Sequence, residues 1–212
     1  AGVTEILSLS ACGSFKEDLD PGTFVIVDQF IDRTIARRKS FFETGMVAHV
    51  GFGHPVCSRL GDALEAGCKT LDIKTQRGGT YLAMEGPQFS TLAESQLYKS
   101  WGCDVIGMTN MPEAKLAREA EMCYATVAMV TDFDCWHPDH DHVTVDAIIK
   151  VLLGNADKGG ALVKEVAPNL SGRTELCSDG CHTALENALI TAPEARDPDV
   201  LAKLDAVAGR VL

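Results

Sequence analysis

Residues 124–136 read YATVAMVTDFDCW, an apolar run that ends abruptly in acidic and aromatic residues. The segment from Tyr124 to Thr131 is rich in Val, Ala and Met, which is typical of a buried strand. Asp132 and Asp134 follow it directly, two residues apart. Because ligands of open α/β sheets bind at the carboxyl ends of strands, this pair of carboxylates predicts a ligand site at the end of the strand.

The segments on either side alternate between short β-branched runs and longer stretches with helical periodicity. This alternation indicates an α/β fold with a parallel or mixed central sheet in one domain, residues 1–212. Residues 11–14 are predicted as a turn and residues 32–40 as a basic, mobile-looking loop. The other expected strands are 6–10, 23–28, 78–84 and 105–108, and the expected helices are 58–67, 90–101, 113–121, 145–155, 179–190 and 197–212.

Composition excludes several classes of partner. The 212 residues include 19 basic and 30 acidic side chains, for a net charge of −11. Such a balance disfavours a nucleic-acid backbone or an anionic membrane as the main partner. No apolar run is long enough for a transmembrane helix, and no secretory signal is visible, so we expect a cytoplasmic protein. Since residues 2–5 lead straight into a buried strand, we also expect natural sequence before residue 1.

Eight cysteines are present. Cys177 and Cys181, followed by His182, could form a local disulfide or half of a metal site. A structural zinc site needs four ligands, and no second pair stands at the right spacing, so no metal is predicted. The other six lie singly among apolar neighbours and are predicted to be buried free thiols in a reducing cytosol: Cys12, Cys57, Cys68, Cys103, Cys123 and Cys135.

Polar clusters follow four of the expected strands, at residues 10–14, 85–90, 108–113 and 131–136. Each has a structural alternative when taken alone. Residues 109–113 could be an ordinary helix start with Pro112 in the first turn, and Asp132-x-Asp134 could bind a divalent metal or solvate a loop. Four such clusters in this order favour a functional site.

Together these clusters resemble the trimeric purine nucleoside phosphorylases, and within them the 5′-methylthioadenosine phosphorylases. The resemblance runs from about residue 6 to residue 152 and becomes looser beyond it. It implies a single three-layer domain with a central mixed sheet flanked by helices, a homotrimer, and inorganic phosphate as co-substrate with no other cofactor. Its motifs are Ala11-Cys12-Gly13-Ser14, residues 27–34, Glu85-Gly86-Pro87, Ala93-Glu94-Ser95, Trp101-Gly102, Met108-Thr109, Pro112-Glu113 and residues 131–136.

The resemblance also implies roles around a purine base. Phosphorolysis replaces the base on C1′ of ribose by phosphate, and the base must leave neutral, so a donor must hold a proton at N7. Asp132 occupies the position of that donor, and Asp134 would accept from the exocyclic N6 amine. Phe89 would lie against the purine face and Ser90 would contact its edge. In oxopurine phosphorylases Asn and Glu replace Asp132 and Ser90, so this pair favours a 6-aminopurine.

The sugar and phosphate contacts implied by the resemblance come from two other strand ends. Met108 would meet the ribose hydroxyls, and Thr109 would reach towards phosphate. Ser10, in place of a more usual Thr, and Ala11 would supply a hydroxyl and a backbone N–H to phosphate. An apolar 5′-methylthio pocket is expected from Val143, Val145 and Ile148, completed by His49 of a neighbouring subunit.

Two features leave alternatives open. His137, His140 and His142 form a cluster that is interpreted as a solvated lid loop rather than a metal site. The family's Gly-rich turn and Arg-His pair, which contact phosphate, have no counterpart before Ser10. Because of Ser90, Asp132 and Asp134, the leading hypothesis is 5′-methylthioadenosine phosphorolysis. The alternatives are a phosphorylase of inosine, guanosine or methylthioinosine and a non-catalytic nucleoside-binding module.

Overall fold

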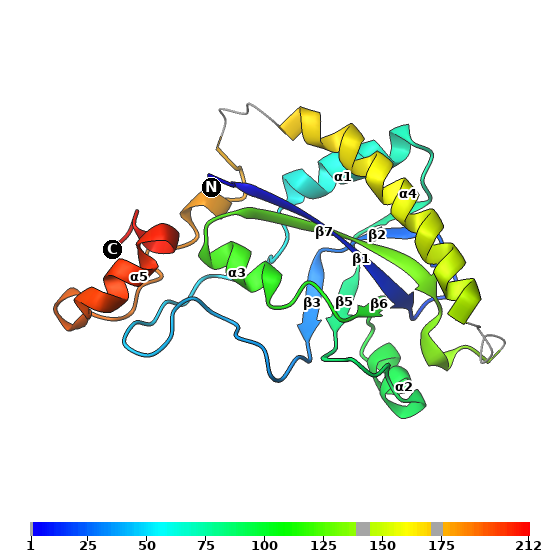
Figure 1. The fold of residues 1–212 in the computed structure, drawn as a ribbon, viewed down its shortest axis with the longest axis horizontal. Helices are drawn as coiled ribbons and strands as arrows, with labels where there is room; N and C mark the ends of the chain where they lie inside the picture. Colours follow the sequence, from blue (N-terminus) through cyan, green and yellow to red (C-terminus); the bar gives the residue numbers. More distant parts are fainter. Residues whose placement is uncertain (1, 139–144, 171–175) are drawn as a thin grey trace.

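A computed structural model describes residues 2–138, 145–170 and 176–212. A seven-stranded mixed sheet forms its centre, with strand order β3-β5-β6-β1-β7-β2-β4 (Figure 1). β1 and β7 pair in parallel, and each has an antiparallel neighbour on its other side, β6 and β2. The strands are β1 (Glu5–Ser14), β2 (Phe24–Ile26), β3 (Gln29–Asp32), β4 (Thr75–Arg77), β5 (Thr80–Ala83), β6 (Val105–Gly107) and β7 (Cys123–Asp132).

Helices cover both faces of the sheet, which confirms the three-layer expectation (Figure 1). Successive residues of β7 point to opposite faces. Val127 packs against α1 and α4, whereas Ala128 and Val130 pack on the side of α3. This strand is buried along almost its whole length, as its apolar run predicts. The α-helices are α1 (Ser58–Thr70), α2 (Leu92–Ser100), α3 (Glu113–Glu119), α4 (Val145–Leu170) and α5 (Pro198–Ala208).

Most predicted elements are confirmed, and local chemistry explains their ends. Thr91 caps α2 in a reciprocal capping box with Glu94, as expected from their spacing. Close packing of α1 on α4 depends on Gly67, where a Cβ atom would lie 2.6 Å from Val166 Cγ2. None of the described helices has the length and apolar character needed to cross a membrane.

The predicted turn over residues 11–14 is wrong, because β1 continues to Ser14. Its last residues pair with β6, Gly13 opposite Ile106 and Ser14 opposite Val105. The register with β7 shifts here, because Cys12 lies opposite Val130 and Gly13 opposite Asp132, so Thr131 of β7 is the extra residue of a bulge.

The predicted helix over residues 179–190 is also wrong. Only a 3₁₀ turn forms there, at Cys181–Thr183. Gly180 and Asn187 have φ angles of 68° and 63°, a left-handed conformation that interrupts helical hydrogen bonding. Leu189 instead forms a β-bridge with Ala48.

Two further differences concern the length of α4 and two short strands. α4 is longer than the predicted 145–155 and ends at Leu170, beyond Pro168. The short strands β3 and β4 were not predicted, because three or four residues with polar side chains carry too little periodicity.

Candidate active site

A cavity of about 290 Å³ collects the polar clusters found in the sequence. It lies where the later part of β1 passes the carboxyl ends of β5, β6 and β7. Seven of the predicted site residues line it: Ser10, Ala11, Phe89, Met108, Thr109, Asp132 and Asp134. Cys12, Gly13, Met84, Ile106, Gly107, Thr131 and Leu152 complete the lining.

A larger cavity of about 780 Å³ lies elsewhere, lined among others by Asp28, His54, Arg77 and Arg118. It holds none of the predicted site residues. We place the active site in the smaller cavity because it combines paired carboxylates, hydroxyls and an exposed aromatic ring in its lining.

The two carboxylates share one short turn. The backbone N–H of Asp134 donates to Oδ1 of Asp132 over 2.9 Å, and the Thr131 hydroxyl lies 2.7 Å from Oδ2. The same hydroxyl is 3.1 Å from the Cys12 carbonyl oxygen. Having one proton and two acceptors, Thr131 can donate to Cys12 and accept from Asp132 when Asp132 is protonated.

Asp134 is half-buried in this turn. Burial raises the pKa of the Asp134 carboxyl above its ordinary value, while the nearby Ser95 hydroxyl and the hydrogen bond from Ser90 oppose this rise. Ser90 Oγ lies 3.0 and 2.9 Å from the two carboxylate oxygens. Although Ser90 is absent from the cavity lining, it orients Asp134, which does line it.

Ser10 and Thr109, which line the cavity, form a cluster of three hydroxyls with Tyr81. Ser10 and Thr109 hydrogen-bond each other, and the Tyr81 hydroxyl lies 3.3 and 3.1 Å from their oxygens. Burial raises the pKa of Tyr81 above its usual value, so it acts here as a neutral donor and acceptor. Gly107 is required beside it, because a Cβ atom there would lie 2.0 Å from the Tyr81 oxygen. No sequence motif indicated Tyr81, although a buried tyrosine hydroxyl needs a partner.

Apolar side chains flank these polar groups. The Phe89 ring is 80% exposed at the cavity mouth, free to cover a flat ligand. The turn before it depends on Gly86, with φ 70°, where a Cβ atom would lie 2.5 Å from Met108 Sδ. Leu152 contributes from α4.

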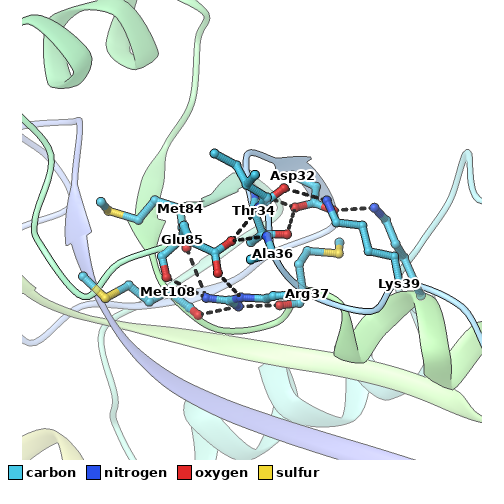
Figure 2. Close-up of polar contacts among 11 residues, drawn as sticks. Asp32, Thr34, Ala36, Arg37, Lys39, Met84, Glu85 and Met108 are labelled. Carbon is cyan, nitrogen blue, oxygen red and sulfur yellow. Dashed lines mark hydrogen bonds and ion pairs between the residues drawn. The ribbon is translucent and has the colours of Figure 1, made fainter.

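Arg37 joins two of the site loops through hydrogen bonds to their carbonyl oxygens (Figure 2). Its Nη1 donates to the carbonyl oxygens of Met108 and Met111, at 2.9 and 2.5 Å, and its Nη2 to that of Glu85 at 2.9 Å. The Glu85 carboxylate in turn accepts from the Ile35 backbone N–H at 2.5 Å. The segment predicted as a mobile-looking loop is therefore anchored, and nothing in its sequence distinguishes Arg37 from Arg38.

The same segment is held at its start by Asp32 (Figure 2). The carboxylate accepts from Thr34 Oγ1 at 2.6 Å and pairs with Lys39 and Lys115. Burial alone would raise the pKa of Asp32, but hydrogen bonds from Lys115 and Thr34 outweigh it and hold the pKa well below its ordinary value. This network orients the chain that leads to Arg37.

The predicted 5′ pocket is not brought together within the described part of the chain. Val143, His140 and His142 lie outside the described residues, as do the side chains of Val145 and Ile148. His49 is exposed and lines no cavity with the other site residues; its backbone N–H donates to the Ala188 carbonyl oxygen at 2.8 Å. A role in a neighbouring subunit's site stays a prediction.

Five of the six cysteines predicted to be buried free thiols are buried and free, and Cys135 is free and half-buried.

Comparisons with known proteins show the family of the chain. The model of the phosphorylase superfamily matches residues 1–168. The S-methyl-5′-thioadenosine phosphorylases of Rhodospirillum rubrum and Bradyrhizobium diazoefficiens are each 66% identical over 212 residues, the whole chain, which covers 72% and 73% of their lengths.

Solved structures give the same result. A methylthioadenosine phosphorylase from an Antarctic soil metagenomic library matches with a TM-score of 0.90 and 44% identity, over 97% of this chain and 72% of that one. The methylthioadenosine phosphorylase of Schistosoma mansoni in complex with adenine matches with a TM-score of 0.79 and 31% identity, over 86% of this chain and 71% of that one. The chain therefore belongs to the phosphorylase superfamily and, within it, to the S-methyl-5′-thioadenosine phosphorylases.

Proposed function

We propose that this protein cleaves 5′-methylthioadenosine with phosphate, giving adenine and 5-methylthioribose 1-phosphate for purine and methionine salvage. One observation carries the proposal: two aspartates, one of them bonded to Ser90, and the hydroxyls of Ser10 and Thr109 line one cavity of about 290 Å³. The aspartates suit an aminopurine base. The hydroxyl cluster suits the ribose hydroxyls and the phosphate anion.

Base release requires a proton at N7. A phosphate oxygen bonds to C1′ while the C1′–N9 bond breaks. The electron pair of the broken bond moves into the purine ring. Asp132 donates the proton to N7, so that adenine leaves neutral. Thr131 and the Asp134 backbone N–H hold this carboxyl in place. Asp134 accepts a hydrogen bond from the N6 amine, and Phe89 covers the ring.

Ser90 supports the choice of a 6-aminopurine. Its hydroxyl donates to Asp134 and keeps that carboxylate as an acceptor facing an N–H donor. A glutamate in place of Ser90 would direct a carboxylate at the lone pair on N1 of adenine, which would repel it.

The hydroxyl cluster belongs to the phosphate and ribose in this proposal. Ser10 and Thr109 donate to phosphate oxygens together with the Ala11 backbone N–H, and Met108 contacts the ribose through its backbone. Tyr81, bonded to both hydroxyls, keeps them aligned before phosphate arrives. No cofactor beyond phosphate enters the reaction.

The 5′ end and the assembly extend the proposal. Val143, Val145 and Ile148 surround the methylthio group, and His49 reaches the site of a neighbouring subunit in a cytoplasmic homotrimer. The exposure of His49 on this chain and the position of Leu152 at the cavity support this arrangement.

The decisive test is release of adenine from 5′-methylthioadenosine by the natural protein, with and without phosphate. We expect release only with phosphate, and a much lower kcat/KM for inosine and 5′-methylthioinosine. Faster turnover of inosine would favour the oxopurine alternative. Binding of methylthioadenosine without release would leave a nucleoside-binding module.

Replacing Ser90 by alanine is expected to move the acid limb of the kcat/KM profile to higher pH. The pKa of Asp134 is already raised by burial, and loss of the Ser90 hydrogen bond removes stabilisation of the charged form. Because the carboxylate is the active form, activity is lost as pH falls through this pKa. A hydrogen bond to a charged group corresponds to about one pKa unit here. An unmoved acid limb, as expected for the control Ser100→Ala, would contradict the role of Ser90.

Replacing Tyr81 by phenylalanine is expected to raise the KM for phosphate by about 3- to 10-fold, the effect of one net hydrogen bond. The ring and its packing remain, but Ser10 and Thr109 lose their shared partner. The KM for the nucleoside should change less. Initial rates over both substrates measure this split, and an equal change in both KM values would count against a phosphate-side role.

A further inference from the structure

Four buried cysteines that are distant in sequence meet at one point of the fold. The Sγ atoms of Cys57, Cys123, Cys177 and Cys181 all lie within 4.8 Å of one another. All four are free thiols, with exposures from 1% to 8%. They lie in the core between the sheet and the pair of helices α1 and α4, and none of them lines the active-site cavity.

Each thiol is placed by a defined piece of backbone. Cys57 immediately precedes α1, and its N–H donates to the Tyr124 carbonyl oxygen at 2.8 Å. Cys123 is the first residue of β7, and its backbone N–H donates to the Thr4 carbonyl oxygen at 2.9 Å. Cys177 and Cys181 are the ends of a tight turn in which the Gly180 N–H donates to the Cys177 carbonyl oxygen at 3.1 Å. The positions are therefore fixed before any ligand binds.

The turn is also fastened to α1. The Asp179 carboxylate accepts from the Ser58 backbone N–H at 2.6 Å and from its hydroxyl at 2.9 Å. A carboxylate at a helix N-terminus is stabilised there by the free N–H groups. This contact holds the loop of Cys177 and Cys181 against the helix that starts after Cys57.

We propose that Cys57, Cys123, Cys177 and Cys181 bind one structural zinc ion. With Zn–S bonds of about 2.3 Å, the sulfur atoms of a tetrahedral site are about 3.8 Å apart. The Cys57 and Cys177 Sγ atoms are 3.6 Å apart. The three residues between Cys177 and Cys181 fall within the usual spacing of zinc-binding pairs. Four thiolate ligands around a tetrahedral centre favour zinc over the harder metals.

The charge balance also fits. Binding releases four protons to solvent and leaves a site with a net charge of −2, because four thiolates surround one Zn²⁺. The Arg59 guanidinium lies beside Cys123, and its Nε is buried without a hydrogen-bond partner among the described residues. Arg59 also pairs with Glu5, and its unused Nε–H can donate to a thiolate of such an anionic site.

The role of this zinc is structural rather than catalytic. All four ligands come from the protein, so no position remains open for a substrate. Cys123 and Asp132 stand at opposite ends of β7, roughly 30 Å apart for a ten-residue strand. The ion joins the turn of Cys177 and Cys181 to β7 and α1, and so fixes the part of the chain that carries Ala188 and its contact with His49.

The test is the metal content of the natural protein, which is purified without a metal-affinity column. Inductively coupled plasma mass spectrometry measures this content. We expect about one zinc ion per chain. Cys177→Ser and Cys123→Ser should lower the zinc content at least about tenfold, since a structural site needs all its ligands. Cys103→Ser is the matched control, because Cys103 is a buried cysteine outside the cluster. The Cys103→Ser protein should keep its full zinc content.

A second measurement does not depend on the folding of variants. Titration of the natural protein with a mercurial reagent, in the presence of a coloured zinc indicator, should release zinc as the four thiols react. Replacement of zinc by Co²⁺ should give the intense absorption of a tetrahedral thiolate site. Zinc below about a tenth of an ion per chain, with these cysteines found as free thiols or disulfides, would overturn the proposal.

Discussion

Asp132→Asn is expected to lower turnover of 5′-methylthioadenosine by about 10²- to 10⁴-fold, the range of a lost general acid. Asparagine has the same shape but holds no transferable proton for N7. Its Oδ1 can still accept from the Asp134 backbone N–H, and its Nδ2 can donate to Thr131, which then donates to Cys12. The folded structure should therefore survive while the chemistry is lost.

The measurement is kcat for adenine release at saturating phosphate, together with kcat/KM for 5′-methylthioinosine. The relative use of the 6-oxopurine should improve, because an amide can donate to an O6 acceptor through its Nδ2. Asp62→Asn, at an exposed aspartate of α1 paired with Arg77, is the matched control and should leave both values unchanged. Unchanged adenine release in the Asp132 variant would remove this residue from the mechanism.

Arg37→Ala is expected to reduce both stability and catalysis. The side chain is about a quarter exposed, and its hydrogen bonds join the loops at Glu85 and at Met108 and Met111. Hydrogen bonds to charged groups contribute about 1.5–3 kcal/mol each; allowing for this exposure and for solvation of the freed carbonyls, we expect a loss of roughly 2–4 kcal/mol in the free energy of unfolding. For a chain of this size that corresponds to a Tm lower by roughly 5–15 °C.

The catalytic effect of the Arg37 variant distinguishes positioning from mere stability. Displacement of the Met108 loop should lower kcat/KM by about 10- to 100-fold at temperatures where the protein is fully folded. Added guanidinium should restore part of the activity, whereas Arg37→Lys should restore little, because an ammonium group cannot span both loops. Arg38→Ala is the matched control, since Arg38 is exposed and pairs only with Glu43 in the described structure. Equal losses in the two variants would contradict the assignment.

Much of the fold could be predicted because its signals are local. The apolar run of β7, the Leu60 and Leu64 stripe of α1 and the capping pair Thr91 and Glu94 each act within a few residues. The failures have the same origin. Gly13 resembles a turn residue locally, yet pairing with β6 keeps it in a strand. Residues 179–190 have helical periodicity, yet Gly180 and Asn187 adopt left-handed conformations.

The candidate site divides in the same way. The sequence indicates Asp132, Asp134, Ser90 and the other strand-end residues because each belongs to a dense local motif. Tyr81 and Arg37 carry no such signal. Tyr81 became part of the site only because β5, β6 and β1 bring its hydroxyl to Ser10 and Thr109.

By itself, the sequence determines the α/β class, the central buried strand and the paired carboxylates at its end, since these depend on periodicity and on neighbouring residues. Tertiary structure alone decided which distant groups meet. Cys57 and Cys123 join Cys177 and Cys181 because α1, β7 and the final segment converge at one point, and Arg37 joins two loops because their carbonyl groups face it. Such contacts depend on strand order and packing, which no local spacing encodes.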